Sequence, residues 1–306
     1  MHASDTCILA LSTAWNFRRH RSGKAMLEEI ASLGFEWAEL HQALDFSLLP
    51  EIADFVDQGK MRISHLRNFC FSPLNGLEGP QFTAEGEEER TLAVCLTQQT
   101  INYAAQLKAG TVILECGRAP GLASHQRLLK LASKGRLYTK NYASAKIREI
   151  LEREKKSPVL KRRVLDCLQE LGNYAVERGV RLAIENCEAY EAYPTERELV
   201  SLLEELNHPA FGYWHNFEHA QIKHYLTLLD HGQWLEQIGA RAIGCSIDDL
   251  QGLDQRHLPP FTGKIAYDKL MPLLQKCSVF VLDLRGVTEN GAIVTASQRW
   301  KSTFCK

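Results

Sequence analysis

The 306-residue sequence is notable first for the features that it lacks. It has no apolar run near the ~18 residues that a membrane-spanning helix needs, and no positively charged start followed by an apolar core. Its formal net charge is only −1, so overall charge favours neither a nucleic-acid nor a membrane-surface partner. Its nine cysteines include no C-x-x-C pair, which is typical of reduced, buried thiols. These absences predict a cytoplasmic protein without a membrane partner.

Two nucleotide-binding signatures are also missing. No G-x-G-x-x-G follows the first apolar run, and no G-x-x-x-x-G-K-[ST] occurs in the chain. The main competing α/β fold is a doubly wound open sheet, and these absences disfavour its nucleotide-binding forms. The chain also lacks a linker rich in Pro, Gly or Ser and any low-complexity tract, so we expect one domain over residues 1–306.

What is present is a regular alternation of short apolar runs with longer amphipathic stretches. Apolar residues in the stretches recur at steps of three and four, which indicates helices, and several stretches end at Gly, a common helix terminus. Eight strands that alternate with helices in about 300 residues predict a single (β/α)8 TIM barrel, in the α/β class, with right-handed crossovers. The predicted strands are residues 6–12, 35–41, 61–66, 110–116, 179–186, 211–215, 241–247 and 278–284.

A helical insertion is expected after the fourth strand, at about residues 120–157. It overlaps a basic segment, residues 130–163, that contains twelve Lys or Arg and three Glu. One interpretation is a solvated helical face, supported by Glu152 and Lys156 at a favourable i, i+4 spacing. The other is a flap that closes over the active site and attracts anionic substrates.

Polar residues gather where the predicted strands end. Active sites of (β/α)8 barrels lie at the C-terminal ends of the strands, where side chains from different strands converge. So many polar groups at strand ends are hard to explain by packing and predict a site there. These residues are Arg67, Glu115, Glu185, Asn216, His219, Ser246, Asp249, Asp283 and Arg285, with Asp254 and His257 in the loop after the seventh strand.

Several of these segments together resemble the xylose isomerase-like barrel superfamily, and most closely its sugar phosphate isomerase/epimerase members. An apurinic-endonuclease branch belongs to the same superfamily. The similarity covers essentially the whole chain, and its most specific parts are the Glu-Asn pair after the fifth strand and the W-H and H-A pairs after the sixth. The segments that carry it are STAWN (12–16), LGFEWAEL (33–40), NFC (68–70), GVRLAIEN (179–186), YWHNFEHA (213–220), RHLPPFTG (256–263) and VLDLRG (281–286).

The resemblance implies a divalent metal ion, held by Glu, Asp, His and Glu from strands five to eight, with further His ligands from strands three and four in the endonuclease branch. Glu185 and His219 match this pattern. The other positions differ: the expected ligands are replaced by Asn216, Ser246 and Asp283 on strands six to eight, and by Arg67 and Glu115 on strands three and four.

These replacements weaken a metal site. Asn216 offers no negative charge, Ser is a poor ligand for Mn, Zn or Mg ions, and a permanent cation at Arg67 repels a dication. We therefore expect no metal cofactor and predict an internal ion pair, in which Arg67 lets the converging carboxylates stay ionised. The alternative is that Arg67 points to solvent while a Mn, Zn or Mg ion binds Glu185, Glu115, His219 and Asp283.

The expected catalytic residues are Glu185, Asp283, His219 and Arg67, and the expected substrate-binding residues are Glu115, Asn216, Ser246, His257, Trp15 and Trp214. Glu185 and Asp283 would be the acid/base pair, and Arg67 would stabilise the enediolate oxygens. The two tryptophans suit a sugar-stacking platform and core packing equally well. Four other histidines are expected at the surface without a role: His2, His20, His125 and His231.

Three functions remain open at this stage. The resemblance implies an isomerase or epimerase that acts on a small sugar or sugar phosphate by proton transfer. Loss of so many ligand positions also suits a non-catalytic barrel that binds a sugar-like or anionic ligand. A DNA-repair endonuclease is disfavoured, because it needs a cluster of metal ions to activate water, so no nucleic-acid partner is expected. A homo-oligomer is compatible with the sequence.

Overall fold

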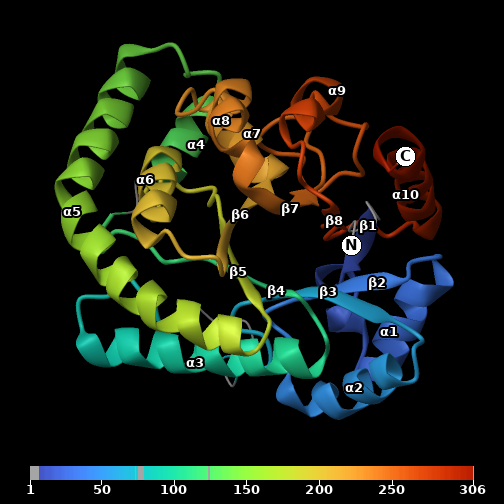
Figure 1. The fold of residues 1–306 in the computed structure, drawn as a ribbon. Coiled ribbons are helices and arrows are strands. Elements are labelled where there is room, and N and C mark those ends of the chain that lie inside the picture. Colours follow the sequence, from blue (N-terminus) through green and yellow to red (C-terminus); the bar gives the residue numbers. More distant parts are fainter. Residues whose placement is uncertain (1–6, 73, 75–78, 123–124, 306) are drawn as a thin grey trace.

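The computed structural model describes residues 7–72, 74, 79–122 and 125–305. Eight parallel strands form a closed barrel in the order β1 to β8, with β1 paired to β8 (Figure 1). This confirms the predicted (β/α)8 barrel. The strands are β1 (Ile8–Ser12), β2 (Trp37–Leu40), β3 (Arg62–Arg67), β4 (Thr111–Leu114), β5 (Arg181–Glu185), β6 (Phe211–Asn216), β7 (Ala242–Ile247) and β8 (Val279–Leu282).

The interior of the barrel is layered. An apolar layer contains Ala10, Ile113, Ala183, Trp214 and Val281, which pack on one another across the barrel. Side chains in a strand alternate between its two faces, so the residue two positions later points the same way. The residues two positions later therefore form the next inward layer, at the C-terminal ends of the strands. All of them are polar: Ser12, Glu39, Arg67, Glu115, Glu185, Asn216, Ser246 and Asp283.

Ten α-helices cover the described part of the barrel, and their apolar faces pack against the outer faces of the strands in one large core. Among the described helices, none is long and apolar enough to cross a membrane. The helices are α1 (Gly23–Ser32), α2 (Leu49–Asp57), α3 (Glu87–Gln106), α4 (His125–Ser133), α5 (Lys140–Glu177), α6 (Glu196–Leu206), α7 (Phe217–Tyr225), α8 (His231–Ile238), α9 (Tyr267–Leu270) and α10 (Asn290–Phe304).

Two helices, α4 and α5, lie between β4 and β5. The 38-residue α5 runs along the outside of the barrel and contacts α3, α4 and α6 (Figure 1). The expected end of the insertion near Ser157 is wrong, because α5 continues through Pro158. A proline inside a helix removes one backbone hydrogen bond. Here the helix is held on both sides, by the Arg153–Glu198 ion pair before Pro158 and by buried Leu160 after it.

Basic residues of segment 130–163 make specific contacts with the rest of the barrel. Arg153 pairs with Glu198 at 2.6 Å and Lys161 with Glu205 at 2.5 Å, which ties α5 to α6. Lys146 and Lys156 donate to the backbone carbonyls of Thr227 and Pro120. These contacts are those of a helix that is docked on the barrel.

Two smaller expectations are corrected. His125 and His231 are 2% and 3% exposed, so they are not surface residues. Each residue is the first of a helix, and it lies on the face of that helix that packs against the barrel. The sequence around each histidine did not show which face it would occupy. The cysteines are not all reduced, since Cys7 and Cys305 form a disulfide with Cα atoms 5.3 Å apart. Closure of the barrel brings these two residues together, which sequence spacing does not reveal.

Candidate functional site

A cavity of about 620 Å³ opens at the C-terminal ends of the strands. We call it the mouth cavity. Of the strand-end residues selected from the sequence, Arg67, Glu115, His219 and Arg285 line it. None of the residues in the basic segment 130–163 does so. The mouth cavity therefore contains cationic groups, anionic groups and histidine side chains.

Arg67 and Glu185 form the central ion pair of the barrel. Two guanidinium nitrogens of Arg67 each donate to one Glu185 carboxylate oxygen, both at 2.9 Å, and both side chains are buried. Burial alone would raise the pKa of Glu185, but the Arg67 charge and its hydrogen bonds outweigh burial and lower it. The predicted ion pair is thus present, and the alternative in which Arg67 points to solvent is wrong.

A second carboxylate, Glu39, faces Arg67 from β2, and sequence reasoning missed it. Its Oε2 lies 3.4 Å from Arg67 Nε and 2.6 Å from His65 Nε2, and Ser12 Oγ donates to its Oε1 at 2.5 Å. Burial opposes ionisation, yet Arg67 and His65 hold the pKa of Glu39 well below its usual range. The signal was a single acidic residue within an otherwise apolar strand, at an inward position two residues after Trp37.

Asp283 pairs with a different arginine from the one expected. Arg285 donates to both of its carboxylate oxygens, at 2.9 and 2.6 Å, and Asp283 is 2% exposed. Burial is outweighed by Arg285, so the pKa of Asp283 is lowered. Glu115 remains outside these pairs: its carboxylate is 53% exposed and 3.9 Å from Arg67 Nη1.

Asn216 and His219 are positioned by the start of α7. The Asn216 side chain accepts from the backbone N–H of His219 as the helix N-cap, and its Nδ2 donates to Glu185 at 3.1 Å. His219 Nδ1 is 2.9 Å from the carbonyl oxygen of Asn186. Because a carbonyl only accepts, Nδ1 carries a proton here, which leaves Nε2 as the ring nitrogen that is not used in this contact.

The structure places three expected substrate-binding residues in the core. Trp214 Nε1 donates to Ser246 Oγ at 2.9 Å, and Trp15 Nε1 donates to the carbonyl of Val287 at 2.8 Å. All three side chains are at most 5% exposed, and none lines the mouth cavity. Core packing, the alternative interpretation of the tryptophans, therefore describes them, because each indole N–H has a partner inside the protein.

His257 belongs to a separate acidic cluster beside the barrel. Its Nδ1 is 2.7 Å from Asp248 and 3.5 Å from Glu218, and burial lowers its pKa. Burial and the neighbouring Glu218 raise the pKa of Asp248 well above its usual value. Arg256 donates to both Glu218 and Glu188. Apart from His257, these residues were missed, because they meet only through the loop after β7.

The residues at the family's metal positions do not fit a metal ion in this arrangement. Both oxygens of Glu185 accept from Arg67, and both oxygens of Asp283 accept from Arg285. Arg67 also donates to Ser246 at 3.3 Å, so a guanidinium lies among the positions that would surround the metal. Among the described residues, groups that could hold an ion are instead Glu218, Asp248 and His257, and His125, Glu149 and Glu191.

Comparisons with known proteins agree with this architecture. Solved structures with the same fold include the 3-keto-D-glucoside 4-epimerase YcjR from E. coli, with a TM-score of 0.67 and 13% identity over 97% of this chain and 99% of that one. A D-psicose 3-epimerase crystallised with D-fructose gives 0.68 and 11% over 98% and 100%. The IolI protein with a bound zinc atom gives 0.66 and 16% over 96% and 97%.

These identities are low, so the structural likeness concerns the fold. No curated protein sequence matches the chain. The family model described as the xylose isomerase-like TIM barrel matches residues 27–300, nearly the whole sequence. The chain therefore belongs to the xylose isomerase-like TIM barrel family.

Proposed function

We propose that this protein is an isomerase or epimerase of small sugars or sugar phosphates, which moves a proton next to a carbonyl group without a metal ion at the barrel centre. The observation that carries this proposal is the mouth cavity, whose histidines, carboxylates and arginines include His219, Glu115, Arg67 and Arg285, in a barrel of this family. A cavity of about 620 Å³ is of the size that small-molecule sites have.

Proton transfer is assigned to His219 and Glu115, in place of the Glu185 and Asp283 pair expected from the sequence. Glu185 and Asp283 hold arginines with both of their oxygens, so neither is free to remove a proton from a substrate. His219 offers its second ring nitrogen, Nε2, and the Glu115 carboxylate is half exposed. Both line the cavity, as an acid and a base in proton transfer must.

The two arginines supply positive charge for the reaction. Arg67 would stabilise the negative charge that develops on the substrate oxygen, with its guanidinium fixed by Glu185 before the substrate arrives. Arg285 uses Nε and Nη2 to hold Asp283, which leaves Nη1, on a side chain that is 41% exposed. We assign to Arg285 the binding of a phosphate or an acidic group of the substrate.

A non-catalytic sugar-binding protein is the second candidate. It is favoured by the full engagement of Glu185 and Asp283 in ion pairs, which leaves fewer free carboxylates than a metal-dependent epimerase would need. The two candidates differ in turnover and share the ligand class.

Deuterium exchange separates them. The protein is incubated in D2O with a panel of ketoses, aldoses and their phosphates, and proton NMR follows both loss of the signal next to the carbonyl and appearance of a new sugar. We expect exchange with at least one sugar, and a rate about 10²–10⁴-fold lower in His219→Gln and Glu115→Gln. The matched control is His208→Gln, at a partly exposed histidine outside the mouth cavity, and it should keep the rate.

Saturable binding of a sugar without any deuterium exchange would contradict the isomerase proposal and would support the non-catalytic sugar-binding protein. Metal content of the wild type and of Glu185→Gln tests the barrel centre separately. An ion bound by the wild type and lost in this variant would contradict the metal-free site.

A further inference from the structure

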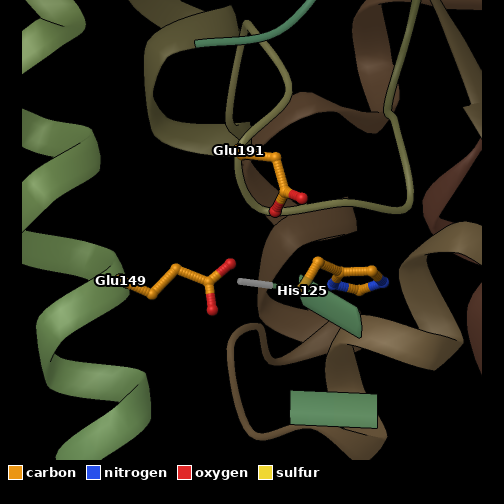
Figure 2. A group of neighbouring side chains, drawn as sticks. All are labelled: His125, Glu149 and Glu191. Carbon is orange, nitrogen blue, oxygen red and sulfur yellow. The ribbon is translucent and has the colours of Figure 1, made fainter. Parts of the chain in front are cut away.

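A second group of buried ionisable side chains lies beside the mouth cavity, away from Glu185. His125 is the first residue of α4, Glu149 lies on α5, and Glu191 lies in the loop between β5 and α6. Figure 2 shows Glu149 extending from α5 toward His125, with the Glu191 carboxylate turned into the same space. One potential ligand atom from each residue lies within 4.8 Å of the other two.

All three side chains of this group are buried, and two of them are carboxylates. His125, Glu149 and Glu191 are 2%, 2% and 4% exposed. Two carboxylates so close together repel each other, and in a buried place the repulsion is hardly screened. For Glu191, no ion pair is found within the described part of the chain, and its Oε2 has no hydrogen-bond partner there. A cation between the two carboxylates would satisfy both of these requirements.

His125 is oriented as a metal ligand would be. Its Nε2 lies 3.3 Å from Glu188 Oε1, whereas its buried Nδ1 has no hydrogen-bond partner among the described residues. Arg256 donates to Glu188 at 2.7 Å, so this carboxylate has a cationic partner on the side away from His125 Nε2. An ionised Glu188 accepts the Nε2 proton, so Nδ1 presents a lone pair. Metal-binding histidines commonly have this arrangement, with a carboxylate on the other ring nitrogen.

The ligand types indicate the class of ion. One imidazole nitrogen and two carboxylate oxygens suit zinc or a similar divalent transition metal, whereas magnesium and calcium prefer oxygen ligands alone. Three protein ligands also leave at least one coordination position open. His125 and Glu191 line the mouth cavity, so an ion has a path to the site and the open position is near the substrate space.

We propose that His125, Glu149 and Glu191 form a binding site for a divalent transition metal ion, with zinc as the reference ion. The ligand atoms are Nδ1 of His125 and one carboxylate oxygen of each glutamate. The bound ion links α4, α5 and the loop after β5, which follow one another along the chain. It therefore fixes the two helices after β4 against the wall of the mouth cavity.

Zinc binding to the full chain tests the proposal. The protein is stripped with a chelator, dialysed and titrated with Zn²⁺ alone, and the bound zinc is counted by plasma mass spectrometry. We expect one equivalent in the wild type, with affinity at least about 100-fold weaker in His125→Ala and Glu191→Gln, because loss even of a supporting partner costs 10–100-fold. Glu185→Gln at the barrel centre is the matched comparison and should keep the zinc.

Binding of Co²⁺ to the wild-type protein tests the site without depending on whether a variant folds. Cobalt bound by one nitrogen and two oxygens in the wild type should give visible absorption that Zn²⁺ displaces, and zinc should raise the melting temperature. Circular dichroism checks that each variant is folded. No zinc bound to the wild type, or zinc retained in both His125→Ala and Glu191→Gln, would overturn the proposal. Zinc lost only in Glu185→Gln would overturn both this proposal and the metal-free barrel centre.

Discussion

Arg67 is the cation among the eight residues given above for the polar layer. It contacts Glu185 through two hydrogen bonds and lies 3.4 Å from Glu39, so one cation serves two buried carboxylates. Taking a charge out of water is costly unless a partner is close and well oriented. A planar guanidinium meets this condition for two carboxylates at once, which a lysine ammonium cannot do with the same geometry.

Arg67→Met should destabilise the protein by about 3–5 kcal/mol, because it leaves the buried Glu39 and Glu185 without their cation. Urea unfolding at pH 7 measures the change. Adding Glu185→Gln to Arg67→Met should recover part of the loss, since one unpaired charge is then removed. If the two single losses simply add in the double variant, the two residues do not interact as described.

Acid should destabilise the protein by protonating Glu39 and Glu185, the two carboxylates that face Arg67. The pKa values of Glu39 and Glu185 are lower in the folded state than the ordinary value of 4.5. Their stabilisation is therefore complete above pH 4.5 and is lost as the pH falls toward the folded-state pKa values. The free energy of unfolding should decline below about pH 4.5, and less steeply in Glu39→Gln. An identical slope in this variant would argue against Glu39 as a source.

At the scale of elements, β6 and β7 fit together through a glycine. A Cβ atom at Gly244 would lie 2.0 Å from Cζ3 of Trp214, which is closer than real atoms approach. The indole of Trp214 fills this space in the apolar layer and donates to Ser246 on the same strand as Gly244. A large side chain on one strand is thus matched by the absence of a side chain on its neighbour.

Gly244→Ala should cost about 1–3 kcal/mol, because the rigid indole must move within a packed core. Chemical denaturation gives the change in free energy, and tryptophan fluorescence reports on the Trp214 environment. The control is Gly291→Ala in α10, where an added Cβ meets nothing within 4 Å, so no such loss is expected. Equal stability of Gly244→Ala and the wild type would contradict the close packing.

Helix α5 ends at a position that the sequence alone did not predict. Pro158 favours a helix end nearby, since proline cannot donate the backbone hydrogen bond. The helix nevertheless continues from Lys140 to Glu177, because its two halves are docked by separate contacts. Tertiary packing outweighs the local cost of one proline, and local propensity alone cannot show this.

At the scale of the whole molecule, barrel closure also joins the two ends of the described chain. β1 pairs with β8, and the residue before β1, Cys7, forms a disulfide with Cys305 just after α10. The sequence predicted nine reduced cysteines because it shows no paired spacing. A pair separated by 298 positions becomes visible only when the barrel is closed.

Thiol titration in denaturant tests this disulfide. Protein purified without reductant should show seven free thiols among its nine cysteines, and nine after reduction. The Cys305→Ser variant should show eight with or without reductant, because Cys7 then has no partner. Nine thiols in the unreduced wild type would mean that the disulfide does not form.

The sequence by itself determined the barrel and the position of its polar layer. Alternation of strands and helices fixes a (β/α)8 fold, and a period of two along each strand carries Glu185, Asn216 and Ser246 to the inner face at the C-terminal end. Both are local patterns, readable from neighbouring residues. They also revealed that a cation, Arg67, stands among the carboxylates.

Only the tertiary structure decided which charges pair and which side chains are buried. Arg67 and Glu185 are 118 positions apart, and Asp283 takes its sequence neighbour Arg285 as its partner in place of Arg67. His125 became a buried group beside two glutamates only through the docking of α4 and α5. Pairing and burial depend on distances in space, which closure of the barrel sets and which local sequence patterns do not contain.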